Sequence, residues 1–176
     1  NLCVILALRT GAEIVVDDVA LTLRVRLFQA LGANPTPMAL SEVFVGLQTG
    51  VIDGQENPLA QIWGSRLYEV QEYLSLTGHV YTPAYVVVSP SRWDVLPNDV
   101  RSILEDEARG VQSFVHETAA RLDQELLEQM RETGVAVNEP ESADFLAASR
   151  EVYDEYEESV PSGSTLVERA TLAGSR

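Results

Sequence analysis

Short apolar runs and segments with helical periodicity alternate through the first part of the chain. Apolar residues recur every three or four positions in 19–31 and again in 41–50, which predicts two amphipathic helices. The apolar run 14–16 precedes the first helix, and the run 51–52 follows the second; each predicts a short buried strand. A further helix is expected over 58–68. This order of elements predicts an α/β fold.

A polar loop is expected between the strand at 51–52 and the helix that Pro58 begins. Gly50 suits the left-handed end of the preceding helix, and Pro58 suits a first helical turn. Gln55-Glu56-Asn57 lies between them, where open α/β sheets commonly place ligand-contacting loops. The local spacing alone favours an ordinary capping loop over a binding loop.

The clearest strand signal is 79–88, which is rich in valine and tyrosine. Its apolar core is unbroken from Tyr85 to Val88, as expected for a strand covered on both faces. The segment 69–76 is ambiguous and fits a helix end followed by a strand. Two prolines in 34–38 exclude a helix there.

One very long helix is expected over 97–132. Apolar residues step by three or four positions throughout it and form one continuous stripe: Leu104, Ala108, Val111, Val115, Ala119, Leu122, Leu126 and Met130. At about 1.5 Å per residue the helix would run ~54 Å, beyond the ~30 Å diameter of a small domain. A coiled coil is the alternative, but the uneven sizes of the stripe residues favour a helix that crosses two lobes. After it, we expect a strand at 135–137 and helices at 142–156 and 166–172.

Charge and composition restrict the class of partner. Twelve basic and twenty-seven acidic residues give a net charge of -15, which disfavours nucleic acid and anionic membrane surfaces. No apolar run reaches the ~18 residues that span a bilayer, so the chain is not expected to be membrane-embedded. The apolar run 2–8 is interpreted as a buried strand or as a remnant of a fragment boundary. The second interpretation is open because Asn1 is not a natural initiator.

Signals of catalysis are weak. The sequence contains no nucleophile elbow, P-loop, dinucleotide-binding glycine motif or metal-spaced cluster, so no enzyme, metal or cofactor is expected. His79 and His116 are far apart, and His116 is expected at the surface of the long helix. A module that encloses a small ligand between two lobes fits better, with the side-chain amides of Gln55 and Asn57 as candidate ligand donors.

The chain resembles the solute-binding subunit of tripartite ATP-independent periplasmic (TRAP) transporters, the DctP-type family. The resemblance runs from about Phe28 to about Tyr156 and rests on motifs in order: ALGANPTPM (30–38), SEV (41–43), LQTGVIDGQENP (47–58), YEVQ (68–71) and TGHV (77–80). It implies a periplasmic, type II two-lobed binding protein that closes on an organic acid and delivers it to a TRAP membrane permease. It also implies that the long helix spans both lobes.

The resemblance also implies which residues contact the ligand. The asparagine that matches Asn57 contacts the substrate carboxylate in the family, and Gln55, Met38 and His79 are further candidates. The position of Leu40 usually carries an aromatic residue that packs on the ligand, so leucine there implies a changed or looser wall.

The largest departure from the family lies upstream. An arginine that pairs with the substrate carboxylate is expected at the position of Asp17, and residues 1–18 match nothing in the family. Arg24 and Arg26 fall on the following helix and are poor substitutes. We therefore interpret the chain as the C-terminal portion of such a receptor.

The sequence divides into four expected regions: an atypical segment (1–18), an α/β ligand-binding lobe (19–88), a short and a long lobe-spanning helix (89–133), and a C-terminal strand with helices (134–176). The alternative function is a non-binding fragment or helical interaction module that self-associates through exposed apolar surface.

Overall fold

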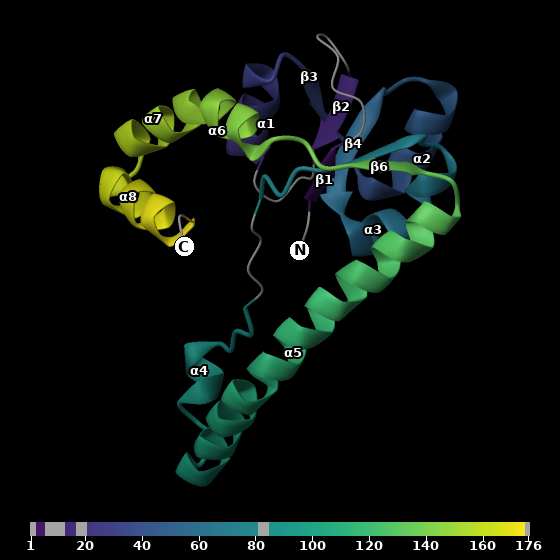
Figure 1. Cartoon of the computed structure of the whole chain (residues 1–176). Helices are drawn as coiled ribbons and strands as arrows, with labels where there is room; N and C mark the ends of the chain where they lie inside the picture. The colour runs from purple at the N-terminus through teal and green to yellow at the C-terminus, as the bar shows by residue number, and fades with distance from the viewer. Residues whose placement is uncertain (1–2, 6–12, 17–20, 81–84, 175–176) are drawn as a thin grey trace.

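A mixed β-sheet lies at one end of the molecule, and helix α5 (Asn98–Glu132) extends away from it (Figure 1). The computed structural model describes residues 3–5, 13–16, 21–80 and 85–174. Helices cover the sheet, and the last helices of the chain lie on the side of α1 (Leu21–Ala30).

The sheet has six strands in the order β3-β2-β4-β1-β5-β6. β2 runs parallel to both β3 and β4, β1 runs antiparallel to β4 and β5, and β6 runs parallel to β5 with Ala136 opposite Tyr73. Segments distant in sequence therefore build one sheet. Its strands are β1 (Cys3–Ile5), β2 (Glu13–Val16), β3 (Asn34–Pro37), β4 (Gly54–Pro58), β5 (Tyr73–Leu76) and β6 (Ala136–Asn138).

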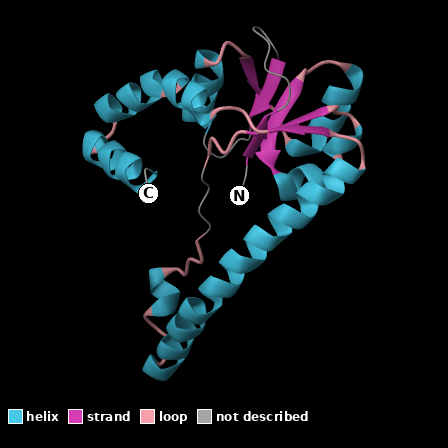
Figure 2. Cartoon of the chain, viewed as in Figure 1, coloured by secondary structure: helices cyan, strands magenta, loops and turns pink. Residues whose placement is uncertain are grey.

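Figure 2 shows the helices packed around this sheet and, away from it, the N-terminal part of α5 near the short helix that precedes it. Gly50 ends α2 in the left-handed conformation at φ 71°, as its position after the apolar repeat predicts. The remaining helical elements are α2 (Leu40–Thr49), α3 (Leu59–Gly64), the 3-10 turn η2 (Leu67–Glu69), α4 (Pro90–Trp93), α6 (Ser142–Ala148), α7 (Arg150–Ser159) and α8 (Gly163–Gly174).

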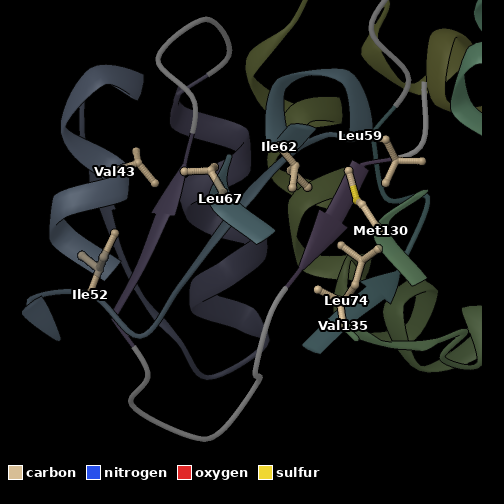
Figure 3. Packing of buried hydrophobic residues seen from close by; sticks show 8 residues of the cluster. All are labelled: Val43, Ile52, Leu59, Ile62, Leu67, Leu74, Met130 and Val135. Carbon is tan, nitrogen blue, oxygen red and sulfur yellow. The ribbon is translucent and has the colours of Figure 1, made fainter. Parts of the chain in front are cut away.

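The main core lies between the sheet and the helices α2, α3 and α5. Figure 3 shows its buried residues: Val43, Ile52, Leu59, Ile62, Leu67, Leu74, Met130 and Val135. Ile14 of β2 and Phe28 of α1 form a second, smaller cluster. The long helix contributes Met130 near its C-terminal end, so this end attaches α5 to the sheet.

Most of the expected elements are confirmed. They include the helices at 41–50, 97–132 and 166–172, and the described part of the helix at 19–31. The strand expected at 51–52 is wrong: Val51 is 65% exposed, and the strand is instead the polar segment β4. Its backbone pairs with β1 on one side and β2 on the other, and this pairing outweighs the polarity of its side chains.

The strand expected over 79–88 is not formed in its described part, 79–80 and 85–88. A strand needs a neighbour that pairs with its backbone, and the side chains of Tyr85 to Val88 are exposed by 52–95%. The single helix expected over 142–156 is also wrong. It divides at Ser149, whose hydroxyl donates a hydrogen bond to the carbonyl of Leu146, and gives α6 and α7.

Across the described part of the chain, no helix is both long and apolar enough to cross a membrane. The boundaries of the four regions stay a prediction. The sheet takes strands from before residue 19 and after residue 88, namely β1, β2 and β6.

Gly163 is expected to tolerate no side chain at the junction of α7 and α8. A Cβ atom there would lie 2.7 Å from the carbonyl oxygen of Tyr156 and 2.9 Å from the Cα of Glu157. Gly163→Ala should therefore cost about 1–3 kcal/mol in the free energy of unfolding, because backbone must move. Gly110→Ala is the control: a Cβ in the middle of α5 meets nothing within 4 Å, and helix propensity should add about 0.5–1 kcal/mol. Urea titration followed by circular dichroism measures both, and equal effects would contradict the packing seen at Gly163.

Candidate functional site

Strand β4 carries three consecutive polar side chains into the centre of the sheet. Gln55 and Glu56 are 0% exposed and Asn57 is 3% exposed. Buried polar groups are costly unless they form hydrogen bonds or ion pairs, so their partners define what this strand does. Successive residues of a strand point to opposite faces, which places Gln55 and Asn57 on one face and Glu56 on the other.

Gln55 and Asn57 form a ladder of side-chain amides. The Asn57 amide nitrogen donates a hydrogen bond to Oε1 of Gln55 over 2.6 Å, and the Gln55 amide nitrogen reaches Oε1 of Gln71 at 3.4 Å. An amide nitrogen carries two hydrogens, so Asn57 can donate a second hydrogen bond while it keeps the first. The ladder fixes the side-chain orientation of Asn57.

Glu56 lies in a buried charged cluster on the other face. Nη1 of Arg24, from α1, donates to Oε1 of Glu56 at 2.9 Å, and their side chains are 9% and 0% exposed. His79 Nε2 lies 3.5 Å from Oε2 of the same carboxylate. Arg24 compensates the negative charge of Glu56 and joins α1 to the centre of the sheet.

His79 is held by two further contacts. Its Nδ1 lies 2.6 Å from Oγ1 of Thr77, and its ring meets Phe28 edge-on, with centroids 5.5 Å apart and an interplanar angle of 86°. These contacts bury the imidazole between the segment Thr77–Val80 and α1. His79 therefore has a packing role on this face of the sheet, in addition to its expected role as a ligand contact.

The candidate residues from the sequence therefore fall into separate groups. Gln55 and Asn57 lie together, whereas His79 contacts Glu56 on the opposite side of β4. Met38 is half-buried against the main core, and Leu40, the first residue of α2, is partly exposed. Asp17, at the position of the expected arginine, lies outside the described residues.

The sequence reasoning missed the pair of Arg24 and Glu56. A signal was present: Arg24 precedes Phe28 by four positions, so both lie on the same, buried face of α1. A basic residue on a buried face needs an acidic partner, but the sequence did not indicate that partner, because Glu56 was expected in a loop.

A cavity of about 650 Å³ adjoins this cluster, between α1, the segment Thr77–Val80 and the helices α6 to α8. Arg24 and His79 belong to its lining, together with apolar residues such as Leu27, Phe145 and Tyr156. Gln55 and Asn57 do not line it, so the cavity belongs to the Glu56 side of the sheet. No group of three or more metal-binding side chains is found among the residues that the structure describes.

A match to a protein-family model shows to which family the chain belongs. The model of the bacterial extracellular solute-binding proteins, family 7 (DctP), matches residues 20–159. The chain belongs to this family. The match covers the polar strand β4, the long helix α5 and the helices up to α7.

Curated relatives agree with this assignment to the DctP family. The chain is 33% identical over 147 residues to the 2,3-diketo-L-gulonate-binding periplasmic protein of Escherichia coli (strain K12). This alignment covers 82% of the chain and 45% of the relative. The chain is 34% identical over 148 residues to the C4-dicarboxylate-binding periplasmic protein of Rhodobacter capsulatus, covering 82% and 44%. The chain thus spans less than half the length of these relatives.

Solved structures show the same fold. A TRAP periplasmic solute-binding protein from Haemophilus influenzae RdAW, with bound L-gulonate, matches the chain with a TM-score of 0.86 at 29% identity. The match covers 98% of this chain and 60% of the solved chain. A second, from Xanthobacter autotrophicus Py2 with bound β-D-galacturonate, has a TM-score of 0.83 at 25% identity, with 96% and 58% covered. The resemblance to TRAP solute-binding subunits and the type II two-lobed fold class are confirmed. The DctP family consists of transport solute-binding proteins.

Proposed function

We propose that the chain works as, or as part of, the extracytoplasmic solute-binding protein of a TRAP transporter. In this role it captures a small organic acid in the periplasm and delivers it to the membrane permease of the transporter, without chemical change to the acid. The ligand is a carboxylate that receives hydrogen bonds from Asn57, with Gln55, Met38, Leu40 and His79 as the other expected contact or supporting residues.

The amide ladder of β4 is the observation that supports this proposal most directly. A carboxylate is recognised by N–H donors held in fixed directions, and the Asn57 amide is fixed by Gln55 and keeps a second hydrogen. Polyhydroxylated acids and dicarboxylates fit the family, because the relatives bind diketogulonate and C4-dicarboxylates, and L-gulonate and galacturonate occupy the solved structures.

The charge on the other face of β4 is compatible with an anionic ligand. An unpaired carboxylate at Glu56 would repel an acid bound at the neighbouring residue. Arg24 forms an ion pair with Glu56 at 2.9 Å and compensates that charge. Arg24 is engaged in this pair, which supports a binding site centred on Asn57 rather than on Arg24.

Isothermal calorimetry against L-gulonate, galacturonate, a C4-dicarboxylate, a 2-oxo acid and sialic acid tests the proposal. At least one acid should give saturable heat with the chain. Asn57→Ala should weaken that binding by about 10–100-fold, because a hydrogen bond to a charged group is worth about 1.5–3 kcal/mol. Absence of heat with every acid would overturn the claim that this chain binds a ligand by itself.

Gln48→Ala is the matched control for this experiment. Gln48 is an exposed amide on α2, in the same motif as Asn57, and its removal should leave the affinity unchanged. An equal loss in both variants would show that the effect on affinity comes from general destabilisation and would contradict the assigned role of Asn57.

A further inference from the structure

The YEVQ motif (68–71) ends in a residue to which the proposed function assigns no role. Gln71 is half-buried and lies between the turn η2 and strand β5. The backbone is fixed on both sides of it. Leu67 and Leu74 belong to the main core (Figure 3), and the carbonyl of Glu72 accepts a hydrogen bond from the backbone N–H of β6 at 2.9 Å. The side chain of Gln71 therefore extends from a firmly held piece of backbone.

The amide ladder from Asn57 through Gln55 to Gln71 has a direction. Nδ2 of Asn57 donates to Oε1 of Gln55 at 2.6 Å, and Nε2 of Gln55 donates to Oε1 of Gln71 at 3.4 Å. A primary amide has a donor end and an acceptor end, so both donors of the ladder point toward Gln71. Gln55 is 0% exposed and has no water contact to replace a lost partner. The direction of the ladder thus depends on the acceptor that Gln71 offers.

Reversal of the ladder would change what Asn57 offers to a ligand. If residue 71 offered a donor, Gln55 would turn its amide over to accept it and would direct Nε2 toward Asn57. Two facing N–H groups repel each other, so the Asn57 amide would also turn over and exchange Nδ2 for Oδ1. An oxygen would then replace the N–H donor beside the ligand carboxylate, and the two oxygens would repel each other.

We propose that Gln71 is a positioning residue of the binding site. Through Gln55 it sets the direction of the Asn57 amide, and it thereby keeps an N–H directed at the ligand carboxylate without touching the ligand itself. A ligand that needs one direction of the amide binds more weakly when part of the molecules hold the other direction. The inference rests on the proposed function, because it assigns the Asn57 amide to a bound acid.

Three substitutions at Gln71 separate this role from simple charge effects. Gln71→Glu keeps an acceptor and offers no donor, Gln71→Met has neither, and Gln71→Lys offers only donors. The affinities for L-gulonate, galacturonate and succinate are measured by calorimetry. For an acid that binds the wild type, Gln71→Glu should stay within about threefold of it, Gln71→Met should lose about 3–10-fold, and Gln71→Lys at least about tenfold. Attraction of the anion by charge alone predicts the reverse order, with Gln71→Lys binding most tightly.

Exchange of side-chain amide protons gives a readout that needs no ligand. In the ¹⁵N-labelled chain, the Asn57 proton that bonds to Gln55 should exchange at similar rates in the wild type and in Gln71→Glu. It should exchange at least about tenfold faster in Gln71→Met and Gln71→Lys, because Gln55 no longer holds its oxygen toward Asn57. Circular dichroism should show all three variants folded, because Gln71 is only half-buried.

Gln48→Met is the matched control, because Gln48 is an exposed amide outside the ladder. It should change neither the affinity nor the exchange of the Asn57 proton. Three results would overturn the inference and leave the proposed function standing: wild-type affinity in Gln71→Met, tightest binding in Gln71→Lys, or equal exchange of the Asn57 proton in all variants. Absence of heat with every acid would overturn the proposed function and, with it, the role of Gln71 at a ligand.

Discussion

Replacing Glu56 with glutamine is expected to lower the free energy of unfolding by about 3–5 kcal/mol, because it removes one charge of a buried ion pair with Arg24. The two side chains are 2.9 Å apart and almost completely shielded from water. His79, which lies 3.5 Å from the other oxygen of Glu56, loses the same partner. Urea unfolding followed by circular dichroism measures the loss.

Two further variants separate burial from simple charge pairing. Arg26 and Glu155 form an exposed ion pair at 3.4 Å, so Glu155→Gln should change stability by no more than about 1 kcal/mol. The double variant Arg24→Met, Glu56→Leu removes both buried charges and should recover most of the stability lost in Glu56→Gln. A loss in Glu56→Gln as small as that in Glu155→Gln would show that the cluster is not desolvated.

Truncation of Met130 to alanine should cost about 2–5 kcal/mol, because it opens a cavity where α5 attaches to the sheet. Met130 is 0% exposed and belongs to the main core with Ile62 and Leu74. The variant should also detach the end of the helix locally, which hydrogen exchange of residues 123–132 would report alongside the urea midpoint.

Leu104→Ala provides the comparison on the same helix. Leu104 of α5 is 47% exposed, and alanine is a good helix former, so the change should stay within about 0.5 kcal/mol. If both truncations cost the same, α5 would be packed along its whole length, contrary to the structure.

The local patterns of the sequence were sufficient to predict most of the long helices and the class of fold. Amphipathic repeats located α1, α2 and α5, and Gly50 ends α2 in the expected conformation, because these signals depend on neighbouring residues alone. The break at Ser149 has no proline or glycine to mark it, and the helix expected over 142–156 therefore concealed α6 and α7.

Strand β4 could not be recognised by its composition. Gln55, Glu56 and Asn57 are typical of loops, and they are buried only because partners distant in sequence satisfy them. The segment 85–88 shows the converse case: its composition predicts a strand, but strand formation requires a neighbour that the described residues do not provide. Pairing between distant segments decides both cases.

For the candidate site, the sequence grouped residues only where they are neighbours in one short segment, which was expected to be a loop. Gln55 and Asn57 were both expected as ligand donors, and in the structure the Asn57 amide donates a hydrogen bond to Gln55. The position of His79 on the opposite face follows from the path of the chain after β5, which no local pattern specifies. The contact of Asn57 with a carboxylate stays a prediction for calorimetry.

The pairing of β5 with β6 has a consequence for synthesis on the ribosome. β5 ends at Leu76, and its parallel neighbour β6 ends at Asn138, sixty-two residues later in the chain (138 minus 76). At about 5–20 residues per second, β5 waits roughly 3–12 s with an open edge while α5 is being made. Translation speed across 77–138 should therefore affect the yield of native protein, and pausing there prolongs the interval in which the nascent chain is open to chaperones and to aggregation.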